Sequence, residues 1–473
     1  MLFCCQSVVN RASASLKRIL MDEKCSKEGF METIKKWIEE NRITEVECLI
    51  PDITGNARGK IMPAKKFLRE GGMRLPEVVF FQTVNGDWPD DESMIDLTEK
   101  DMNLEPDPNT IRFVPWAKDP TAQVIHDCQT VDGDPVEISP RAVLRRVLAL
   151  YEKEGWSPIV APELEFFLVQ KNLDWDYPLE PPIGRNGRPE TARQSFSIDA
   201  VNEFDPIFED MYDYCEIQGL DVDTLVHESG AAQMELNFDH GEPLDRADQV
   251  FLFKRTVREA ALRHDVYATF MAKPMEHEPG SAMHIHQSLV DANGKNLFAN
   301  DDGSNSELFL NYIAGMQKYT PAAIAFFAPN INSYRRLVFG DSAPTNVAWG
   351  EDNRTVGLRV PVSDKNSRRI ENRYAGADAN PYLAMALTLA CGYLGMKEKL
   401  TPTPQSTGDM TTEPYSLPHT LEEALVLLEN CNELREILGD RFVSAYVAIK
   451  RKEYKTFFQV ISSWEREFLL LNV

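Results

Sequence analysis

Several short segments of this chain place an acid or a histidine where a metal ion could be bound. They are APELEFFLV with Glu163 and Glu165, VHESGAAQMELNF with Glu228 and Glu235, GSAMHIHQSL with His284 and His286, and RRIENR with Glu371. Together they provide several carboxylates, few histidines and neighbouring arginines. This donor set suits a hard divalent cation that holds phosphate groups.

The spacing of Glu163 and Glu165 predicts that both carboxylates share one face of a strand. Aromatic and aliphatic residues follow them, and side chains two apart in a strand point the same way. Two like charges on a half-buried face repel each other and lose hydration, so they need a cation or raised pKa values. The alternative is a strand whose acidic face is simply exposed to solvent.

The same alternation occurs in two further segments. Glu235 lies in QMELNF, and His284 and His286 lie in MHIHQS. A single strand histidine is more often a structural residue, whereas a pair at this spacing suggests a shared task. We therefore expect three neighbouring strands to form one wall of carboxylates and imidazoles.

The region 332–373 adds counter-charges for an anion. It contains the arginines Arg335, Arg336, Arg354, Arg359, Arg368, Arg369 and Arg373. Arginine binds carboxylate and phosphate oxygens in bidentate fashion, which indicates anion binding here. The common nucleotide and hydrolase motifs GxGxxG, GxSxG and HExxH are absent, and the segment GNARGK lacks the spacing of a P-loop.

Length and composition exclude several protein classes. The 473 residues predict two or three domains, and 43% hydrophobic content suffices for a large core. A net charge of −24 argues against a nucleic-acid partner. Eight scattered cysteines without a CxxC pair indicate reduced thiols in the cytoplasm. The apolar stretch 381–396 is short for a membrane span, so a buried helix is expected.

The pattern along the chain predicts an α+β protein of two domains. Residues 27–130 contain a helix over 27–40, then the strands ITEVECLIPDI and ARGKIM around a turn. Residues 135–473 begin with a helix that follows Ser139-Pro140. The breaker-rich stretch 171–193 is a long loop, which is often functional in a compact domain. Residues 1–26 are expected to be disordered or a targeting segment; the first 20, which are basic and lack acids, are either a transit segment or, as we favour, precede a true start at Met21.

Taken in order, five motifs resemble those of the glutamine synthetase superfamily. They are APELEFFL, HESGAAQMEL, GSAMHIHQSL, NSYRRLVFGDSAPTNVAWGEDNRTVGLRVP and RRIENRYAGADANPYL, within a resemblance that spans about residues 33–473. The resemblance implies a small N-terminal β-grasp-like domain. A large catalytic domain would follow, with a curved antiparallel sheet, or half-barrel, flanked by helices. AGADANPYL and NSYRR look closer to the γ-glutamylpolyamine synthetase (glutamate–putrescine ligase) branch.

The resemblance also implies roles for single residues. One metal ion would be held by Glu165, Glu228 and Glu235. A second, which touches the nucleotide phosphates, would be held by Glu163, His284 and Glu371. The positions that contact the nucleotide are His286, Ser288 and Arg369. The catalytic arginines that hold glutamate and the transferred phosphoryl group are Arg336, Arg354 and Arg373, and Gly280 would line the glutamate site beside Arg336 and Arg373.

In this family ATP phosphorylates the side-chain carboxylate of glutamate, and an amine then attacks the γ-glutamyl phosphate. The cofactors implied are ATP and Mg²⁺, with Mn²⁺ as an alternative ion. A carboxylate is a poor electrophile, and phosphorylation gives it a leaving group. Metal ions and arginines neutralise the charge that develops during the transfer.

The chain departs from ammonium-using members at two positions. Those enzymes carry a flap glutamate in PGYEAP, where this chain has FGDSAP with Ser342. They also carry an aspartate in an FDGSS-like segment, where FQTVNG places Thr83. The loss of both carboxylates should weaken ammonium use and leave room for a larger amine, so Thr83 and Ser342 are candidates for the amine site. The acidic run Asp87, Asp90, Asp91 and Glu92 either attracts a distal ammonium group or is a solvated loop.

The sequence therefore predicts an ATP-dependent ligase that joins glutamate to a polyamine or another primary amine, such as putrescine. One alternative is a genuine glutamine synthetase with an altered flap. Another is a catalytically inactive structural or regulatory member. The resemblance implies a homo-oligomeric ring, with a dodecamer as one form, and no nucleic-acid or membrane partner. Tyr415 faintly resembles a regulatory tyrosine segment, although an ordinary loop tyrosine is favoured.

Overall fold

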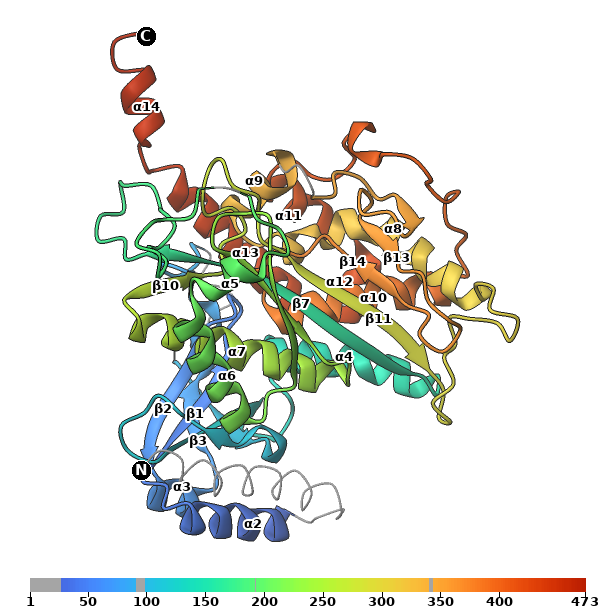
Figure 1. Ribbon diagram of the computed structural model, residues 1–473. Helices are drawn as coiled ribbons and strands as arrows, with labels where there is room; N and C mark the ends of the chain where they lie inside the picture. The colour runs from blue at the N-terminus through green and yellow to red at the C-terminus, as the bar shows by residue number, and fades with distance from the viewer. Residues whose placement is uncertain (1–26, 91–97, 192, 340–342) are drawn as a thin grey trace.

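The computed structural model describes residues 27–90, 98–191, 193–339 and 343–473, and two sheets organise them (Figure 1). The N-terminal sheet has the strand order β2-β1-β6-β4-β3, with β5 paired to β6. Its strands are β1 (Glu45–Pro51), β2 (Ala57–Pro63), β3 (Met73–Pro76), β4 (Asp101–Pro106), β5 (Arg112–Phe113) and β6 (Thr121–Gln129). Because β1 is antiparallel to β2 and parallel to β6, this sheet is mixed.

Short helices accompany this first sheet. They are α2 (Lys27–Glu40), α3 (Ala64–Glu70) and the 3₁₀ turns η1 (Glu77–Phe81) and η3 (Pro108–Thr110). The predicted helix over 27–40 and the predicted hairpin of β1 and β2 are confirmed. Residues 1–26, with the expected transit segment or misassigned start, lie outside the described residues.

The second sheet is the larger one, with the order β12-β13-β14-β11-β7-β9-β8 and β10 paired to β7. Its strands are β7 (Ser157–Gln170), β8 (Val222–His227), β9 (Gln233–Phe238), β10 (Val266–Thr269), β11 (Met283–Val290), β12 (Trp349–Glu351), β13 (Leu358–Val360) and β14 (Ile370–Asn372). All of its pairings are antiparallel except that of β12 with β13. The predicted α+β class with a largely antiparallel catalytic sheet is confirmed.

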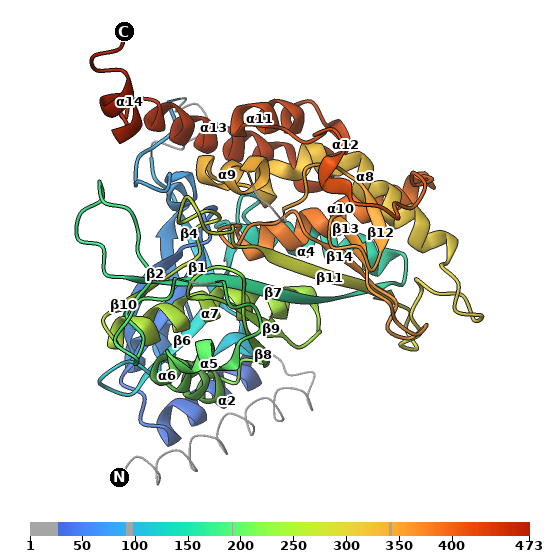
Figure 2. The ribbon, with the colours of Figure 1, turned by 45° about the horizontal axis from the view of Figure 1, so that its top comes forward.

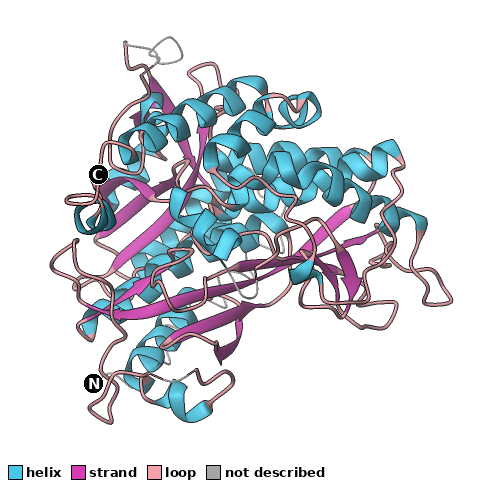
Figure 3. Cartoon of the chain, turned by 90° about the horizontal axis from the view of Figure 1, so that it is seen from above, coloured by secondary structure: helices cyan, strands magenta, loops and turns pink. Residues whose placement is uncertain are grey.

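The other helices lie between residues 140 and 468, and several of them pack against one another, as the view from above shows (Figure 3). They are α4 (Pro140–Lys153), α5 (Ile198–Asn202), α6 (Asp205–Gln218), α7 (Pro243–Arg263), α8 (Glu307–Phe327), α9 (Ile331–Phe339), α10 (Pro381–Glu398), η4 (Met410–Thr412), α11 (Leu421–Glu429), α12 (Asn432–Leu438), α13 (Asp440–Phe457) and α14 (Ser463–Phe468). Helix α10 is buried from Pro381 to Met396, as its apolar sequence predicts. Within the described ranges, no helix has the length and apolarity needed to cross a membrane.

Strand alternation gives the second sheet one apolar and one polar face. Phe166 of β7 and Phe238 of β9 both contact Phe253 of α7 at ring-centroid distances of 6.4 and 5.4 Å. Side chains one residue away in each strand must therefore point to the opposite side. Figure 2 shows the long strands β7 and β11 side by side. Strand register places the side chains predicted to do chemistry on the face that α7 does not cover.

A buried arginine ties the first sheet to the helices of the second. Arg141 of α4 is 1% exposed and donates to Asp107 at 2.6 Å, to Asp127 at 2.5 Å and to Asp248 of α7 at 2.7 Å. Tyr382 of α10 donates to Asp248 as well, at 2.7 Å. One guanidinium thus balances acids that come from both parts of the chain.

We expect Arg141→Ala to destabilise the protein strongly, because it leaves Asp248 buried without its counter-charge and removes the closer of the two arginines that pair with Asp107. Removal of one partner from a buried ion pair costs about 3–5 kcal/mol. The matched control is Arg145→Ala. Arg145 pairs with Asp107 and Asp127, but its side chain is 46% exposed, so its loss should cost about 0–1 kcal/mol. Urea unfolding followed by circular dichroism measures both, and equal losses would contradict this account of Arg141.

Candidate active site

Strand register brings the predicted acids and histidines onto one face of the second sheet. Across β7, Glu163 faces His284 of β11 and Glu165 faces Glu235 of β9. His286 of β11 faces Glu371 of β14. Residues directly opposite each other in antiparallel strands share a face. The predicted wall of carboxylates and imidazoles is therefore confirmed, and we call it the acidic face: Glu163, Glu165, Glu235, His284, His286 and Glu371.

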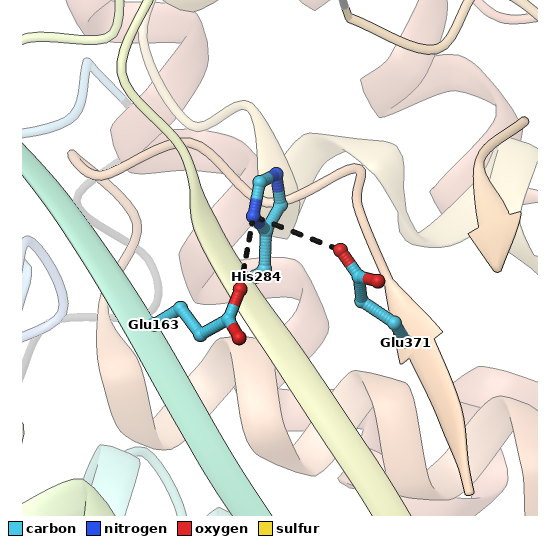
Figure 4. A group of neighbouring side chains, drawn as sticks. All are labelled: Glu163, His284 and Glu371. Atoms are coloured by element: carbon cyan, nitrogen blue, oxygen red, sulfur yellow. Dashed lines mark ion pairs between the residues drawn. The ribbon is translucent and has the colours of Figure 1, made fainter. Parts of the chain in front are cut away.

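The first potential metal-binding group on the acidic face is Glu163, His284 and Glu371, from three adjacent strands (Figure 4). The His284 Nδ1 atom lies 3.5 Å from a Glu163 oxygen and 3.7 Å from a Glu371 oxygen. Glu163 also accepts a hydrogen bond from His286 Nε2 at 3.0 Å. Burial alone would raise the pKa of Glu163, but the hydrogen bonds from both histidines outweigh it and keep the carboxyl ionised.

The second potential group is Glu165, Glu235 and His284, whose ligand atoms also lie within 4.8 Å of one another. His284 therefore borders both groups found among the described residues. Glu228, expected as the third ligand beside Glu165 and Glu235, is not in this group, but its charge acts on both carboxyls. It follows the end of β8, and its backbone N–H donates to Gln233 at 2.8 Å.

The electrostatics of the second group indicate that it needs a cation. Burial, together with the charge of Glu228, raises the pKa of Glu165 to about 8. Burial and the surrounding carboxylates raise the pKa of Glu235 to about 9. Burial also raises the pKa of Glu228, and the positive charge of Arg354 opposes that shift. Carboxyl groups this close together avoid repulsion either by binding protons or by binding a divalent ion. Their oxygen atoms are ligands that suit Mg²⁺ or Mn²⁺.

Two arginines brace Glu371, which is 1% exposed. Arg359 of β13 donates to one of its oxygens at 2.8 Å, and Arg373 donates to the other at 2.5 Å. Burial would raise the pKa of Glu371, but the nearby positive charges lower it to about 2. The sequence indicated Arg359 as an anion-binding arginine without a role of its own. The structure adds that it orients a predicted metal ligand.

The residues expected to contact a nucleotide line one cavity of about 390 Å³. His286, Ser288 and Arg369 form part of its wall, together with Glu163. Asn237, which faces Glu163 across β7 and β9, lies in the same wall, and its buried Oδ1 atom has no hydrogen-bond partner. A cavity with an arginine, a histidine and an unsatisfied polar atom fits the charged part of a nucleotide.

The residues expected to hold glutamate also lie together. A Cβ added at Gly280 would lie 2.6 Å from the Arg336 side chain, so only glycine allows this approach. Arg336 donates to the carbonyls of Arg373 and Tyr374, both at 2.9 Å. Arg354 is exposed and lies near Glu228. Arg336 and Arg373 thus lie near Glu165 of the second group, and Arg354 lies near Glu228 beside that group.

The candidates for the amine site are less complete. Ser342 lies outside the described residues, as do Asp91 and Glu92. Thr83 is buried, and its hydroxyl donates to Asn85 at 2.6 Å and accepts from the Asp87 N–H at 2.8 Å. Asp90 accepts from Lys452 at 2.7 Å and Lys455 at 2.6 Å. These contacts occupy Asp90, which weakens the view that the acidic run attracts a substrate ammonium.

One residue that sequence patterns missed holds the turn that carries Glu228. Glu190, from the long loop 171–193, lies 3.0 Å from the ring of His227 and accepts from the Ala232 N–H at 2.8 Å. Ala232 has a left-handed backbone, with φ of 56°, which this hydrogen bond supports. The sequence indicated a functional loop, but no local signal distinguishes Glu190 from its other acids.

Comparison with known proteins agrees with this geometry. Residues 137–469 match the catalytic domain of glutamine synthetase. The chain belongs to the glutamine synthetase family, as its motifs predict, and it is a carbon–nitrogen ligase. The family uses ATP and a divalent metal ion.

Individual relatives cover almost the whole chain. γ-Glutamylputrescine synthetase PuuA of Escherichia coli (strain K12) is 35% identical over 94% of this chain and 95% of its own length. Glutamate–isopropylamine ligase of a Pseudomonas species is 31% identical over 91% of this chain and 96% of its own. The solved structure of GmaS without ligand superposes with a TM-score of 0.80 at 27% identity, over 92% of this chain and 98% of that chain.

The raised pKa values predict how pH changes the metal-free protein. Between about pH 4.5 and 9 the folded state holds protons on Glu235 and Glu165 that the unfolded chain has released. Stability should therefore fall as pH rises through this window, and Mg²⁺ should raise the melting temperature more at pH 8.5 than at pH 6.

Glu235→Gln should flatten the pH dependence of the metal-free melting temperature and reduce the stabilisation by Mg²⁺. The control is Glu45→Gln, because Glu45 is exposed on β1 and should leave both curves unchanged. Differential scanning fluorimetry from pH 6 to pH 9 gives both readouts. A metal-free stability that rises with pH in the wild type would contradict the assignment.

Proposed function

We propose that this enzyme uses ATP to join the side-chain carboxylate of glutamate to a primary amine, through γ-glutamyl phosphate. The observation that carries the proposal is the acidic face, where two potential metal groups share His284 beside the cavity that contains His286 and Arg369. Magnesium or manganese ions bound there would neutralise phosphate oxygens during the transfer. Neither ion is favoured by the donor set.

The residues of the chain supply position and charge for this reaction. Arg336, held against Gly280, and Arg373 would fix the carboxylates of glutamate. Arg354, beside Glu228, would approach the transferred phosphoryl group. Phosphorylation turns the carboxylate oxygen into a leaving group, and the unprotonated nitrogen of the amine then attacks the carbonyl carbon. Phosphate departs, and the nitrogen gives up a proton to complete the amide.

An amine larger than ammonium is favoured over ammonium itself. A compact cation needs acidic groups around it, and the position where ammonium-using members carry an aspartate is here Thr83, whose hydroxyl is occupied within its own turn. The relatives PuuA and glutamate–isopropylamine ligase are named for alkyl amines. We further propose, from the family resemblance, a homo-oligomeric ring that works in the cytoplasm. An inactive member is less supported, because five of the six predicted ligands, all except Glu228, belong to the two potential metal groups.

The test is ATP-dependent phosphate release with glutamate and a panel of nucleophiles: ammonium, methylamine, isopropylamine, n-butylamine and putrescine. We expect kcat/KM for at least one alkyl amine to exceed that for ammonium by tenfold or more. Arg373→Lys should abolish turnover with every amine, because a single ammonium group cannot reproduce the bidentate guanidinium. Efficient ammonium use without alkyl amine turnover would overturn the proposal and favour a glutamine synthetase.

A further inference from the structure

Asp378 is a carboxylate that holds the start of helix α9 against the segment 373–380, which connects β14 to α10. Its Oδ2 atom accepts a hydrogen bond from the Ser333 hydroxyl at 2.6 Å and another from the Asn330 side-chain amide at 2.7 Å. These donors lie in the first turn of α9 and directly before it. Because hydrogen bonds to an ionised acceptor are stronger than neutral ones, Asp378 fixes the start of this helix.

Arg336 of the same helix binds the beginning of the segment 373–380. It donates to the carbonyls of Arg373 and Tyr374, each at 2.9 Å. Ser333 and Arg336 are three residues apart, so their side chains lie on one face of α9. The helix is thus bound at two points to the segment that begins with Arg373, and these contacts set the place of Arg336 relative to Arg373.

The segment 373–380 is also bonded to elements other than α9. The Ala377 N–H donates to the carbonyl of Ser281, the residue after Gly280, at 3.0 Å. Lys254 of α7 donates to the carbonyl of Ala377 at 2.6 Å. Since these contacts fix the segment, a carboxylate on it can serve as a fixed point for α9.

The place of the Asp378 carboxylate depends on Gly376. A Cβ atom at residue 376 would lie 2.4 Å from Asp378 Oδ1, so a side chain there would displace the carboxylate. The Oδ1 atom is buried and has no hydrogen-bond partner. A buried acceptor without a partner destabilises a protein, so stability alone does not account for a carboxylate at this position.

The charge of Asp378 favours the close approach of two guanidinium groups. Burial lowers the pKa of Arg336 to about 10, and the positive charge of Arg373 adds to this shift. The negative charges of Glu165 and Asp378 oppose it. Glu165 is a predicted metal ligand, so a bound cation would compensate its charge, whereas the charge of Asp378 would still act on Arg336.

We propose that Asp378 is a positioning residue for glutamate, because it fixes α9 and thereby keeps Arg336 and Arg373 in the relative placement that binds one substrate. This role rests on the proposed function, in which both arginines hold the carboxylates of glutamate. Loss of Asp378 should weaken glutamate binding and leave the nucleotide and amine sites nearly unchanged.

The experiment compares Asp378→Ala, Asp378→Asn and wild type in steady-state phosphate release, with the nucleophile of the panel that the wild type uses best. Asp378→Ala should raise KM for glutamate about tenfold, since loss of a hydrogen bond to a charged group has roughly this effect. Its kcat and its KM values for ATP and the amine should stay within about twofold. Asp378→Asn keeps an acceptor oxygen, and a neutral hydrogen bond has about half the strength of a charged one, so we expect a rise of about threefold. Asp378→Asn also carries the test if the alanine variant does not fold.

Gly376→Ala is an independent test, because the added methyl group displaces the carboxylate without removing it. It should raise KM for glutamate about tenfold, as Asp378→Ala does. In the Asp378→Ala background the same change should add less than about twofold, since the oxygen that the methyl group would meet is gone. Two independent effects that multiply in the double variant would contradict the proposed role.

The control is Asp302→Ala, because Asp302 also accepts from a serine hydroxyl at 2.6 Å, that of Ser304, but lies in an exposed turn. It should change none of these values. An equal rise in KM for glutamate and for ATP in Asp378→Ala would overturn the proposed role. A lower kcat with unchanged KM for glutamate, or no change at all, would also overturn it.

A binding measurement without turnover separates this role from the proposed function. The melting temperature is followed against glutamate concentration with ADP and Mg²⁺ present, and the apparent dissociation constant should be about tenfold larger in Asp378→Ala. Equal constants in the variant and the wild type would overturn the role of Asp378. A wild type that binds glutamate but releases no phosphate with any amine would instead refute the proposed function, and a wild type that does not bind glutamate would overturn both.

Discussion

The structure depends on the repulsion among buried carboxylates that share one face of a sheet. Glu163, Glu165, Glu235 and Glu371 come from β7, β9 and β14, and ligand atoms within each potential metal group lie within 4.8 Å of one another. Glu165, Glu235 and Glu371 are buried and Glu163 is half-buried, so water screens their charges weakly, and the ionised forms are costly unless positive charge is nearby. The site therefore needs positive charge close to these carboxylates. Divalent metal ions would supply that charge.

Positive side chains reduce this repulsion at Glu371 more than at Glu165 and Glu235. At Glu371, Arg359 and Arg373 each donate to one carboxylate oxygen, and the charges of His284, Arg373 and His286 lower the pKa to about 2 despite burial. At Glu165 and Glu235 no arginine donates a hydrogen bond to the carboxylates in the described structure, and their pKa values rise. The carboxylates of the first group, Glu163 and Glu371, are therefore ionised before any metal ion binds. Those of the second group, Glu165 and Glu235, would release protons when a metal ion binds. Metal binding at the second group should depend more strongly on pH.

Sequence reasoning succeeded where the signal was local. The period-two spacing of Glu163 with Glu165, and of His284 with His286, determines which face each side chain occupies once a strand forms. The apolar residues between them point to the opposite face, where Phe166 packs against α7. The order of the family motifs along the chain then indicated that these strands belong to one site. Alternation within one strand could not show that His284 would border both ligand groups, because that depends on pairing between strands.

The features that the sequence did not reveal arise from contacts across long separations. Glu190 reaches His227 over 37 residues, and Arg141 reaches Asp248 over 107. Their loops and helices contain other acids and arginines with the same local pattern, so only the folded chain selects the partner. Asp90 shows the converse, since this member of an acidic run that was a candidate for binding an ammonium group proves to be paired with Lys452 and Lys455.

The groups proposed to activate glutamate and the described candidate for the amine site lie on different kinds of element. The groups expected to act on phosphate sit on β7, β9, β11 and β14, whose pairing restricts side-chain positions to small displacements. Thr83, a candidate for the amine site, belongs to a turn outside that sheet. Phosphoryl transfer requires accurate charge placement, whereas accommodation of a longer alkyl chain requires mainly space and apolar surface. Loops can change the second property while the sheet preserves the first, so one catalytic face can serve different nucleophiles.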